Sequence, residues 1–531
     1  MTKIQFSRKQ LCIPYAVFLA LFVIVPMLLI LFYAFTGTDG RFTFENFLNF
    51  FTSTAKLSTL LMSFTIAIIT TAFCLVIAYP VAYLLARSKF KRKNVLLMLF
   101  ILPMWINFVL RITALRELLD WVGLLGTQNY LNTIIGMVYD FLPFMILPLY
   151  TTLEKLDTSL MEAASDLGGN AFTVFTKVTF PLSMPGVISG ITMVFMPSMT
   201  NYVISDTLSN FNITILGKLI DEYFTTYNNW HMGSMISIIL LILIFITMAL
   251  TGGFRSNGQK DARGGPFMVK KILSVAFCAL VLVFIYAPIL LLVVYSFTAS
   301  KIIGQWTGFS LDLYRQLFKN AEIMGILFNT VWLALAAAVL ATVLGTAGAI
   351  GIFYSKKKVS KPIEGVSQIP VINAEIVTAI SLALLFSMIA LYRTYFSLLI
   401  GHMVLCTPFV VLSVLPKLKQ MDPNTYEAAL DLGASPSRAL FKIVIPQIFS
   451  GILSGFMLSI TLSLDDYIVT AFTKPKTFDT ISTYVYNAVR NGTNSSTPAL
   501  RALSALIFVV MIAAVLVINL RASRKKEGKG L

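Results

Sequence analysis

The chain has 531 residues, of which 57% are hydrophobic and only 12% are charged. An average soluble domain carries roughly 25% charged residues, so a soluble protein of this composition could not cover its core with polar surface. The formal net charge of +17 does not indicate nucleic-acid binding, because the basic residues cluster in short runs between apolar segments. The sequence therefore predicts an integral membrane protein whose basic runs meet anionic lipid.

Twelve segments are long and apolar enough to cross a bilayer as helices, which takes about 20 residues each. They lie near residues 12–35, 57–86, 94–115, 130–152, 186–206, 231–252, 271–297, 323–354, 364–390, 395–415, 448–472 and 500–520. Placing both termini and the basic loops in the cytoplasm gathers most of the 41 lysines and arginines there, as the positive-inside rule requires. We therefore expect a multi-pass, all-α membrane protein with both termini cytoplasmic.

Two distant segments of the chain repeat one another without a gap. Residues 157–190 read DTSLMEAASDLGGNAFTVFTKVTFPLSMPGVISG and residues 422–455 read DPNTYEAALDLGASPSRALFKIVIPQIFSGILSG, with 12 of 34 positions identical. We call this alignment, in which residue 157 matches residue 422, the repeat register. The chain is therefore a duplication of a six-span unit, and both copies have the same orientation because six is even. The predicted domains are residues 1–252, a Gly-rich and charged cytoplasmic linker at 253–270, and residues 271–531.

Each repeated segment begins with the signals of a short helix. Asp157 and Asp422 are placed to cap the start of the helix, and Pro423 fits the first helical position. Gly168 and Gly433 suit the left-handed backbone conformation that commonly ends a helix. Both copies therefore predict a helix of two to three turns that ends at a glycine.

A second short helix is expected after each glycine. Ser435–Pro436 carries its start signal in the second copy, and Pro181 and Pro446 are expected to end it. Each copy is thus predicted to be a helix–glycine–helix elbow with arms too short to cross a bilayer. We call residues 157–181 the first elbow and residues 422–446 the second elbow, and the charge rule places both in the cytoplasm.

The elbows carry a pattern of Glu-Ala-Ala, three residues, Gly, nine residues, and then two aliphatic or aromatic positions before a proline. The matching residues are Glu162, Ala163, Ala164, Gly168, Val178, Phe180 and Pro181 in the first elbow, and Glu427, Ala428, Ala429, Gly433, Ile443, Ile445 and Pro446 in the second. This doubled pattern resembles the signature loop of permease subunits of type I ABC importers. The resemblance implies the type I permease fold, with two six-helix repeats in a bacterial cytoplasmic (inner) membrane.

In that family the loop forms the coupling helix that docks into a cleft of the ATP-binding subunit. The resemblance therefore implies two copies of a cytoplasmic ABC ATPase, which would hold ATP and Mg, and a separate extracytoplasmic binding protein or lipoprotein. The chain itself contains no G-x-x-x-x-G-K-[ST] phosphate loop. We therefore expect it neither to hydrolyse ATP nor to bind a cofactor.

A narrower resemblance concerns the substrate. Residues 196–206 and 212–239 look like the first permease of spermidine/putrescine importers, and residues 463–470 look like the matching stretch of the second permease. In that family the two permeases are usually separate chains, so this chain looks like their fusion in the same order. The resemblance implies a polyamine as the substrate and a polyamine-binding protein as the partner.

A pathway for polyamines should offer carboxylates to the ammonium groups and aromatic rings for cation–π contact. Acids and neighbouring tyrosines within or near apolar spans are the candidates, because an ionised carboxylate in a span costs about 2.5–3.5 kcal/mol and usually faces a cavity or a partner. The predicted pathway residues are Asp465, Asp466, Tyr467, Glu375, Asp206 and Tyr202. Because the repeat register matches the acidic pair with Thr200 and Asn201, the path is expected to be asymmetric.

Alternatives remain open for these acids and for the whole chain. Asp466 could instead cap a short outer helix or pair with a basic residue, and Glu375 could hydrogen-bond between helices. The substrate could be sulfate, molybdate, phosphate or iron. The chain could also be an ion-coupled secondary transporter or a membrane anchor for an ATPase. The four cysteines and the two histidines, His231 and His402, are scattered and predict neither disulfides nor a metal site.

Overall fold

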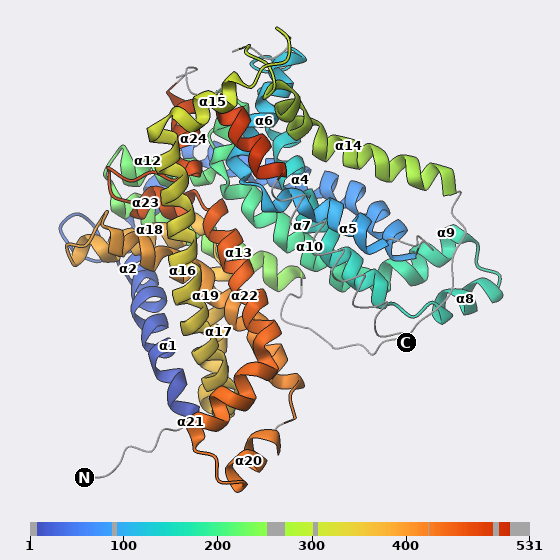
Figure 1. Ribbon diagram of the computed structural model, residues 1–531. Coiled ribbons are helices and arrows are strands. Elements are labelled where there is room, and N and C mark those ends of the chain that lie inside the picture. Colours follow the sequence, from blue (N-terminus) through green and yellow to red (C-terminus); the bar gives the residue numbers. More distant parts are fainter. Residues whose placement is uncertain are drawn as a thin grey trace. The chain divides into compact units, whose positions relative to one another are not determined.

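The computed structural model describes residues 8–87, 93–251, 271–300, 306–422, 424–491 and 499–509 (Figure 1). Within these ranges the chain is helical, and its only strand-like features are two isolated bridges, Thr36–Phe42 and Thr298–Phe309. This confirms the predicted all-α fold. The predicted linker at 253–270 and the predicted helix start at Pro423 lie outside the described residues, so these predictions stay untested.

The chain divides into two compact units that do not coincide with the two halves of the sequence. Unit 1 consists of Met1–Phe50, Ile220–Leu241 and Glu322–Tyr484, and unit 2 consists of Phe51–Leu219, Ile242–Ala321 and Val485–Leu531. Five helices have residues in both units, namely α3 (Glu45–Phe51), α12 (Leu216–Thr225), α13 (Trp230–Thr251), α24 (Ile481–Arg490) and, by its first residue alone, α16 (Ala321–Tyr354).

Unit 2 is built mainly from the first half of the sequence. Its long helices α4, α7 and α10 pack on one another along their lengths. The helices are α4 (Thr54–Arg87), α5 (Lys93–Ile101), α6 (Phe108–Trp121), α7 (Asn129–Lys155), α8 (Ser159–Asp166), α9 (Ala171–Val174), α10 (Phe180–Thr200), α11 (Tyr202–Leu208), α14 (Lys271–Tyr295) and α15 (Asp312–Lys319). The apolar helix Ala499–Val509 also belongs to this unit.

Unit 1 is built mainly from the second half and contains the counterparts of these helices. The helices are α1 (Cys12–Leu19), α2 (Val25–Ala34), α16 (Ala321–Tyr354), α17 (Lys357–Ile372), α18 (Glu375–Met388), α19 (Tyr395–Gln420), α20 (Asn424–Asp431), α21 (Pro436–Ala439), α22 (Ile445–Asp465) and α23 (Ile468–Thr473). From α8 and α20 onward the boundaries follow the repeat register closely, and α10 and α22 match in it at both ends. The sequence duplication is therefore also a duplication of structure.

The predicted spans correspond to helices, but two of the spans are broken. Nine helices in the described residues are long and apolar enough to cross a membrane, and two bent pairs raise the number to eleven. The predicted span at 94–115 bends by 94° between Trp105 and Phe108, and the span at 364–390 bends by 108° between Ile372 and Glu375. Of the predicted span at 500–520, only the part up to Val509 is described.

The predicted spans at 186–206 and 448–472 also need correction. The helices that form them start earlier, at Ala171 and Pro436, and break at Thr200 and Asp465, before the predicted ends. Each helix therefore rises from an elbow without interruption, and a short separate helix follows the break.

The first helix of each half packs in the unit of the other half. Helices α1 and α2 of the first half contact α17 and α18, as Figure 1 shows for the blue helices within unit 1. Helix α14, the first of the second half, contacts α4, α5 and α6 within unit 2. This exchange explains why the compact units differ from the sequence repeats.

Each half contains a close helix–helix contact at a glycine, and the two contacts occupy matching positions. A Cβ atom on Gly186 of α10 would lie 2.9 Å from the carbonyl oxygen of Pro148, and a Cβ atom on Gly451 of α22 would lie 2.9 Å from that of Ser413. The repeat register matches Gly186 with Gly451 and Pro148 with Ser413. Small residues allow such close approach between membrane helices.

We predict that Gly186→Ala and Gly451→Ala each lower the free energy of unfolding by about 1–3 kcal/mol, because the added methyl group meets backbone. Thermal unfolding of the purified protein in detergent measures the effect. Gly325→Ala is the matched control, since a Cβ atom there would meet nothing within 4 Å. Equal melting temperatures for the three variants would contradict the close packing.

Candidate functional site: two elbows and buried acids

The first arm of each elbow forms as predicted. Asp157 accepts a hydrogen bond from the Ser159 amide at 2.9 Å, and Asp422 accepts one from the Asn424 amide at 2.9 Å. The bond from Ser159 lowers the pKa of Asp157. Gly168 and Gly433 end the arms with φ values of +84° and +82°. The helix–glycine geometry is therefore the same in both elbows.

The second arm of each elbow does not end at its proline. Helix α9 passes through a π-helical turn, Phe175–Thr179, into α10, so Pro181 lies inside a continuous helix. Pro446 follows the π-helical turn Leu440–Val444 in the same way. A π-helical turn shifts the hydrogen-bond pattern to i→i−5, and such shifts help a helix to accommodate a proline that donates no N–H. Each elbow is thus joined rigidly to a membrane span.

Each elbow exposes one apolar side chain beside its glycine. Leu167 is 90% exposed and Leu432 is 89% exposed. The predicted coupling glutamates, Glu162 and Glu427, are exposed as well. A single exposed leucine is ordinary on a protein surface, but these two occupy matching positions in the repeat register, each directly before the glycine of its elbow.

The alanines of the motif differ in burial. Ala163 and Ala428 are exposed, Ala164 is half-buried and Ala429 is 6% exposed. The exposed alanines extend the surface beside the glutamates, whereas Ala429 packs into unit 1. The exposed part of the motif is therefore the first alanine of each pair.

Asp206 lies in a buried cluster of unit 2 and already has a cationic partner. Its carboxylate is 3.0 Å from Lys218 Nζ and accepts a hydrogen bond of 2.6 Å from the Tyr486 hydroxyl. Lys218 also lies 5.3 Å from the ring centroid of Tyr202. Because both charges are buried, each depends on the other for its stability. Two predicted pathway residues, Asp206 and Tyr202, thus both lie beside Lys218, a cation that belongs to the chain itself.

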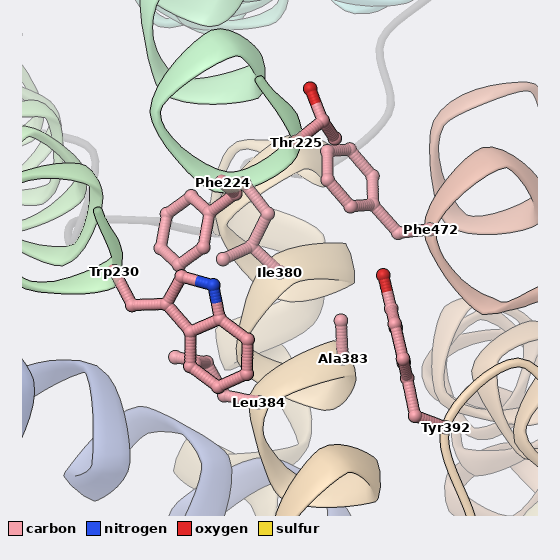
Figure 2. A pocket seen from close by; sticks show the side chains of 8 residues that line it. All are labelled: Phe224, Thr225, Trp230, Ile380, Ala383, Leu384, Tyr392 and Phe472. Atoms are coloured by element: carbon pink, nitrogen blue, oxygen red, sulfur yellow. The ribbon is translucent and has the colours of Figure 1, made fainter. Parts of the chain in front are cut away.

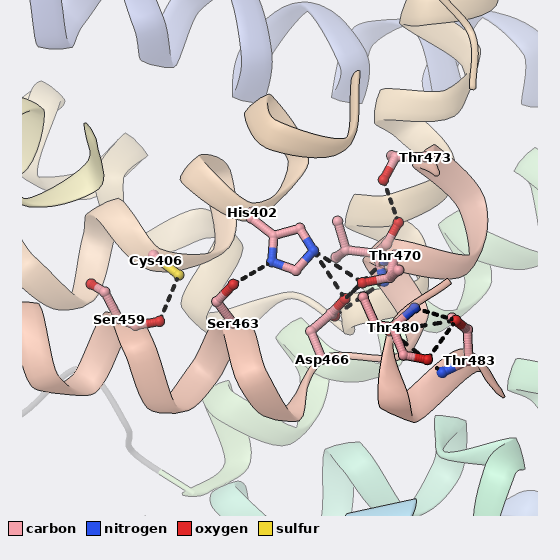
Figure 3. Close-up of polar contacts among 10 residues, drawn as sticks. His402, Cys406, Ser459, Ser463, Asp466, Thr470, Thr473, Thr480 and Thr483 are labelled. Carbon is pink, nitrogen blue, oxygen red and sulfur yellow. Dashed lines mark hydrogen bonds and ion pairs between the residues drawn. The ribbon is translucent and has the colours of Figure 1, made fainter. Parts of the chain in front are cut away.

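Asp466 caps a short helix of unit 1 (Figure 3). Its carboxylate accepts hydrogen bonds from the Val469 amide at 3.1 Å, the Thr470 amide at 2.8 Å and the Thr470 hydroxyl at 2.7 Å. His402 lies 3.7 Å from the same carboxylate and contacts Ser463 Oγ at 2.7 Å. This is the capping arrangement that the sequence left open as an alternative, and a pathway role for Asp466 stays a prediction.

The remaining predicted pathway residues lie near helix breaks of unit 1. Asp465 is half-buried at the end of α22, and Tyr467 is 6% exposed in the break before α23. Glu375 is exposed at the first position of α18, directly after the 108° bend. Discontinuous helices commonly carry the binding sites of transporters, and an acid at a helix N-terminus is favoured by the helix dipole.

An aromatic pocket of unit 1 lies beside α18 (Figure 2). Phe224 and Trp230 come from α12 and α13, Tyr392 follows α18, and Phe472 belongs to α23. Ile380, Ala383, Leu384 and Thr225 complete the lining. The pocket offers ring faces, and its lining contains no carboxylate.

Several charged residues in the site region were not identified from the sequence. Arg111 and Asp140 form a buried ion pair of 2.9 Å, and Arg501 and Glu117 form one of 3.2 Å. Arg111 and Asp140 both stand inside predicted spans, where a charge is rare, and that signal could have found them. The described residues contain no group of three side chains that could hold a metal ion.

Comparison with known proteins places the chain among transport proteins. It matches the family of binding-protein-dependent transport system inner membrane components over residues 78–254 and 341–524. It is 38% identical over 247 residues to the spermidine/putrescine transport system permease protein PotB of Haemophilus influenzae, covering 43% of this chain and 86% of that protein. It is 30% identical over 263 residues to the corresponding PotC of Shigella flexneri, covering 50% of this chain and 98% of that protein.

We predict that Asp206→Asn lowers the free energy of unfolding by about 3–5 kcal/mol, because it leaves the buried Lys218 beside a neutral amide. Adding Lys218→Met should restore most of the loss. Thermal unfolding in detergent measures both effects. Asp312→Asn is the control, since its pair with Arg315 is exposed and contributes at most about 1 kcal/mol. Equal melting temperatures for Asp206→Asn and Asp312→Asn would contradict the buried pair.

Proposed function

The chain belongs to the family of binding-protein-dependent transport system inner membrane components, and on that premise we propose that it combines both permease halves of an ATP-driven polyamine importer. Two domains of this family follow one another in the chain, and the PotB and PotC relatives each match about half of it. A single chain would thus do the work of two permease subunits, with its termini and elbows on the cytoplasmic side.

The observation that carries this proposal is the matched pair of elbows. Each presents an exposed glutamate, an exposed alanine and an exposed leucine before a glycine with positive φ. Each is also continuous with a membrane span through a π-helical turn. Two equal docking sites in one chain suit a pair of ATPase subunits, which would bind ATP and Mg. This permease supplies positioning and gating and no chemistry of its own.

Transport then follows alternating access. A loaded binding protein docks on the extracytoplasmic face, and ATP draws the two ATPase subunits and both elbows together. Because each elbow continues into a span, its displacement moves α10 or α22 as a rigid lever. Hydrolysis of ATP lets the ATPase subunits separate, and both elbows then return to their starting positions. An ion-driven secondary transporter would have no use for two matched docking elbows, whereas an ATPase anchor would use them and differs from a permease in moving no solute.

A polyamine is the substrate that the relatives and the chemistry support best. The relatives are named as spermidine/putrescine permeases. Asp465 with Tyr467 offers the combination of carboxylate and ring that ammonium groups need. Asp206 and Tyr202 already hold an ammonium group in this way, that of Lys218. The anions sulfate, molybdate and phosphate would gain nothing from these acids.

We predict that Glu162→Gln and Glu427→Gln each lower ATP-driven spermidine uptake by about tenfold or more, which corresponds to the loss of one ionic docking contact. Proteoliposomes that contain the chain, its ATPase and its binding protein measure uptake of labelled spermidine and putrescine. Glu364→Gln is the matched control, because its contact with Lys419 is a long one of 3.9 Å on the surface.

Wild-type uptake by both elbow variants would refute the docking role of the elbows. Uptake of sulfate in place of polyamines would refute the substrate assignment alone. Uptake without the ATPase, driven by an ion gradient, would favour a secondary transporter. Binding of the ATPase with no uptake of any solute would favour an anchor.

A further inference from the structure

We propose that Arg8 is a positioning residue that fixes the second elbow through Glu427, and this inference rests on the coupling role proposed for the elbows. Arg8 Nη2 donates a hydrogen bond of 2.8 Å to Glu427 Oε1. The guanidinium carbon also lies 3.7 Å from the ring centroid of Tyr426 and 4.1 Å from that of Tyr354. One arginine thus joins the start of the chain, the end of α16 and the first arm of the second elbow.

The guanidinium is held on several sides, which separates it from an ordinary surface ion pair. Its side chain is only 21% exposed, whereas exposed surface arginines such as Arg315 reach 75%. Guanidinium groups stack on aromatic faces and bind carboxylates directionally, so two rings and a carboxylate restrict its position more than a carboxylate alone would. Glu427 keeps 58% of its side chain exposed and remains available to a partner.

The chain that carries Arg8 is anchored, so the contact can transmit a constraint. Arg8 begins the helical run that leads into α1, and α1 packs on α16 so closely that a Cβ atom on Gly351 would overlap Cys12. Tyr15 is fully buried and hydrogen-bonds to Ser367 of α17. Helix α1 of the first half therefore packs against α16 and α17, which precede the second elbow in the chain.

In the described residues, the surroundings of the first elbow differ from this arrangement. The repeat register matches Tyr426 with Met161. Alignment of the helix ends, in place of the repeat register, pairs Arg87, the last residue of α4, with Tyr354, the last residue of α16. Arg87 instead donates a hydrogen bond of 3.2 Å to the Leu156 carbonyl, just ahead of the first elbow. In the part of the chain that the structure describes, Arg87 thus contacts backbone ahead of the first elbow, whereas Arg8 contacts Glu427 and two rings at the second elbow.

The first test measures spermidine moved per ATP hydrolysed by the full transporter in proteoliposomes. We expect Arg8→Ala to lower this ratio about three- to tenfold, with normal insertion and assembly, because Glu427 then loses the contact that fixes the position of the second elbow. Arg8→Lys should recover only part of the loss, since an ammonium group keeps the charge but not the planar stacking. Lys419→Ala, which removes an exposed cation in a loose 3.9 Å pair, should leave the ratio unchanged.

A double-mutant cycle separates positioning from general destabilisation. If Arg8 acts through Glu427, Arg8→Ala should add little to Glu427→Gln. Losses that simply multiply, or a wild-type ratio for Arg8→Ala, would overturn the proposal.

A cysteine pair tests the contact without relying on transport. In the doubly substituted chain, Arg8→Cys with Glu427→Cys, a bifunctional thiol reagent about as long as the two replaced side chains should cross-link the two positions in membranes, whereas the four native cysteines are buried. Failure to cross-link would overturn the positioning role. Efficient cross-linking together with normal uptake by Glu427→Gln would leave the contact intact and refute the coupling function of the elbow instead.

Discussion

The structure depends on the pairing of backbone amides where helices are interrupted. A bilayer core offers no water to a freed amide, so each break needs a partner from within the protein. The hydroxyl of Ser63 accepts the Leu216 amide at 2.8 Å, and the hydroxyl of Thr330 accepts the Ile481 amide at 2.9 Å. Both contacts join a long helix to the start of a short one. Leu216 matches Ile481 in the repeat register, so this contact belongs to the duplicated structure.

The positions of most spans, the first arms of the elbows and the left-handed glycines could be predicted because each depends on local pattern. Apolar length, a capping aspartate and a glycine are readable along the chain. The bends after Trp105 and Ile372 were not predicted, although a proline precedes each bend, Pro103 and Pro370, and an asparagine stands at each, Asn107 and Asn373. These signals were outweighed by the apolar length of each segment. The packing of α1 and α2 in unit 1 and of α14 in unit 2 could not be predicted either, because it depends on contacts between segments far apart in the sequence. Pro181 misled the prediction because a π-helical turn accommodates it.

The halves agree in their packing and differ in their buried charges. Gly186 and Gly451 make the same close contact, yet Asp206 and Lys218 have Ala471 and Thr483 at the matching positions. A duplicated helix bundle must keep its small contact residues or lose its packing. Buried charges can change one half at a time, provided that each charge gains a partner within its own unit. The asymmetry expected from the sequence thus lies in polar clusters on a common scaffold.

The exchange of first helices gives the N-terminus influence over the second elbow. Unit 1 contains α1, α16 and the second elbow, so a movement of that elbow acts on helices that come from both halves of the sequence. The close contact at Gly351 and the ion pair between Arg8 and Glu427 tie these parts at two separate points. The first contact fixes α1 on α16, and the second joins the residue ahead of α1 to the elbow. A displacement of the elbow should therefore be passed through Arg8 to α1, and from α1 to α16.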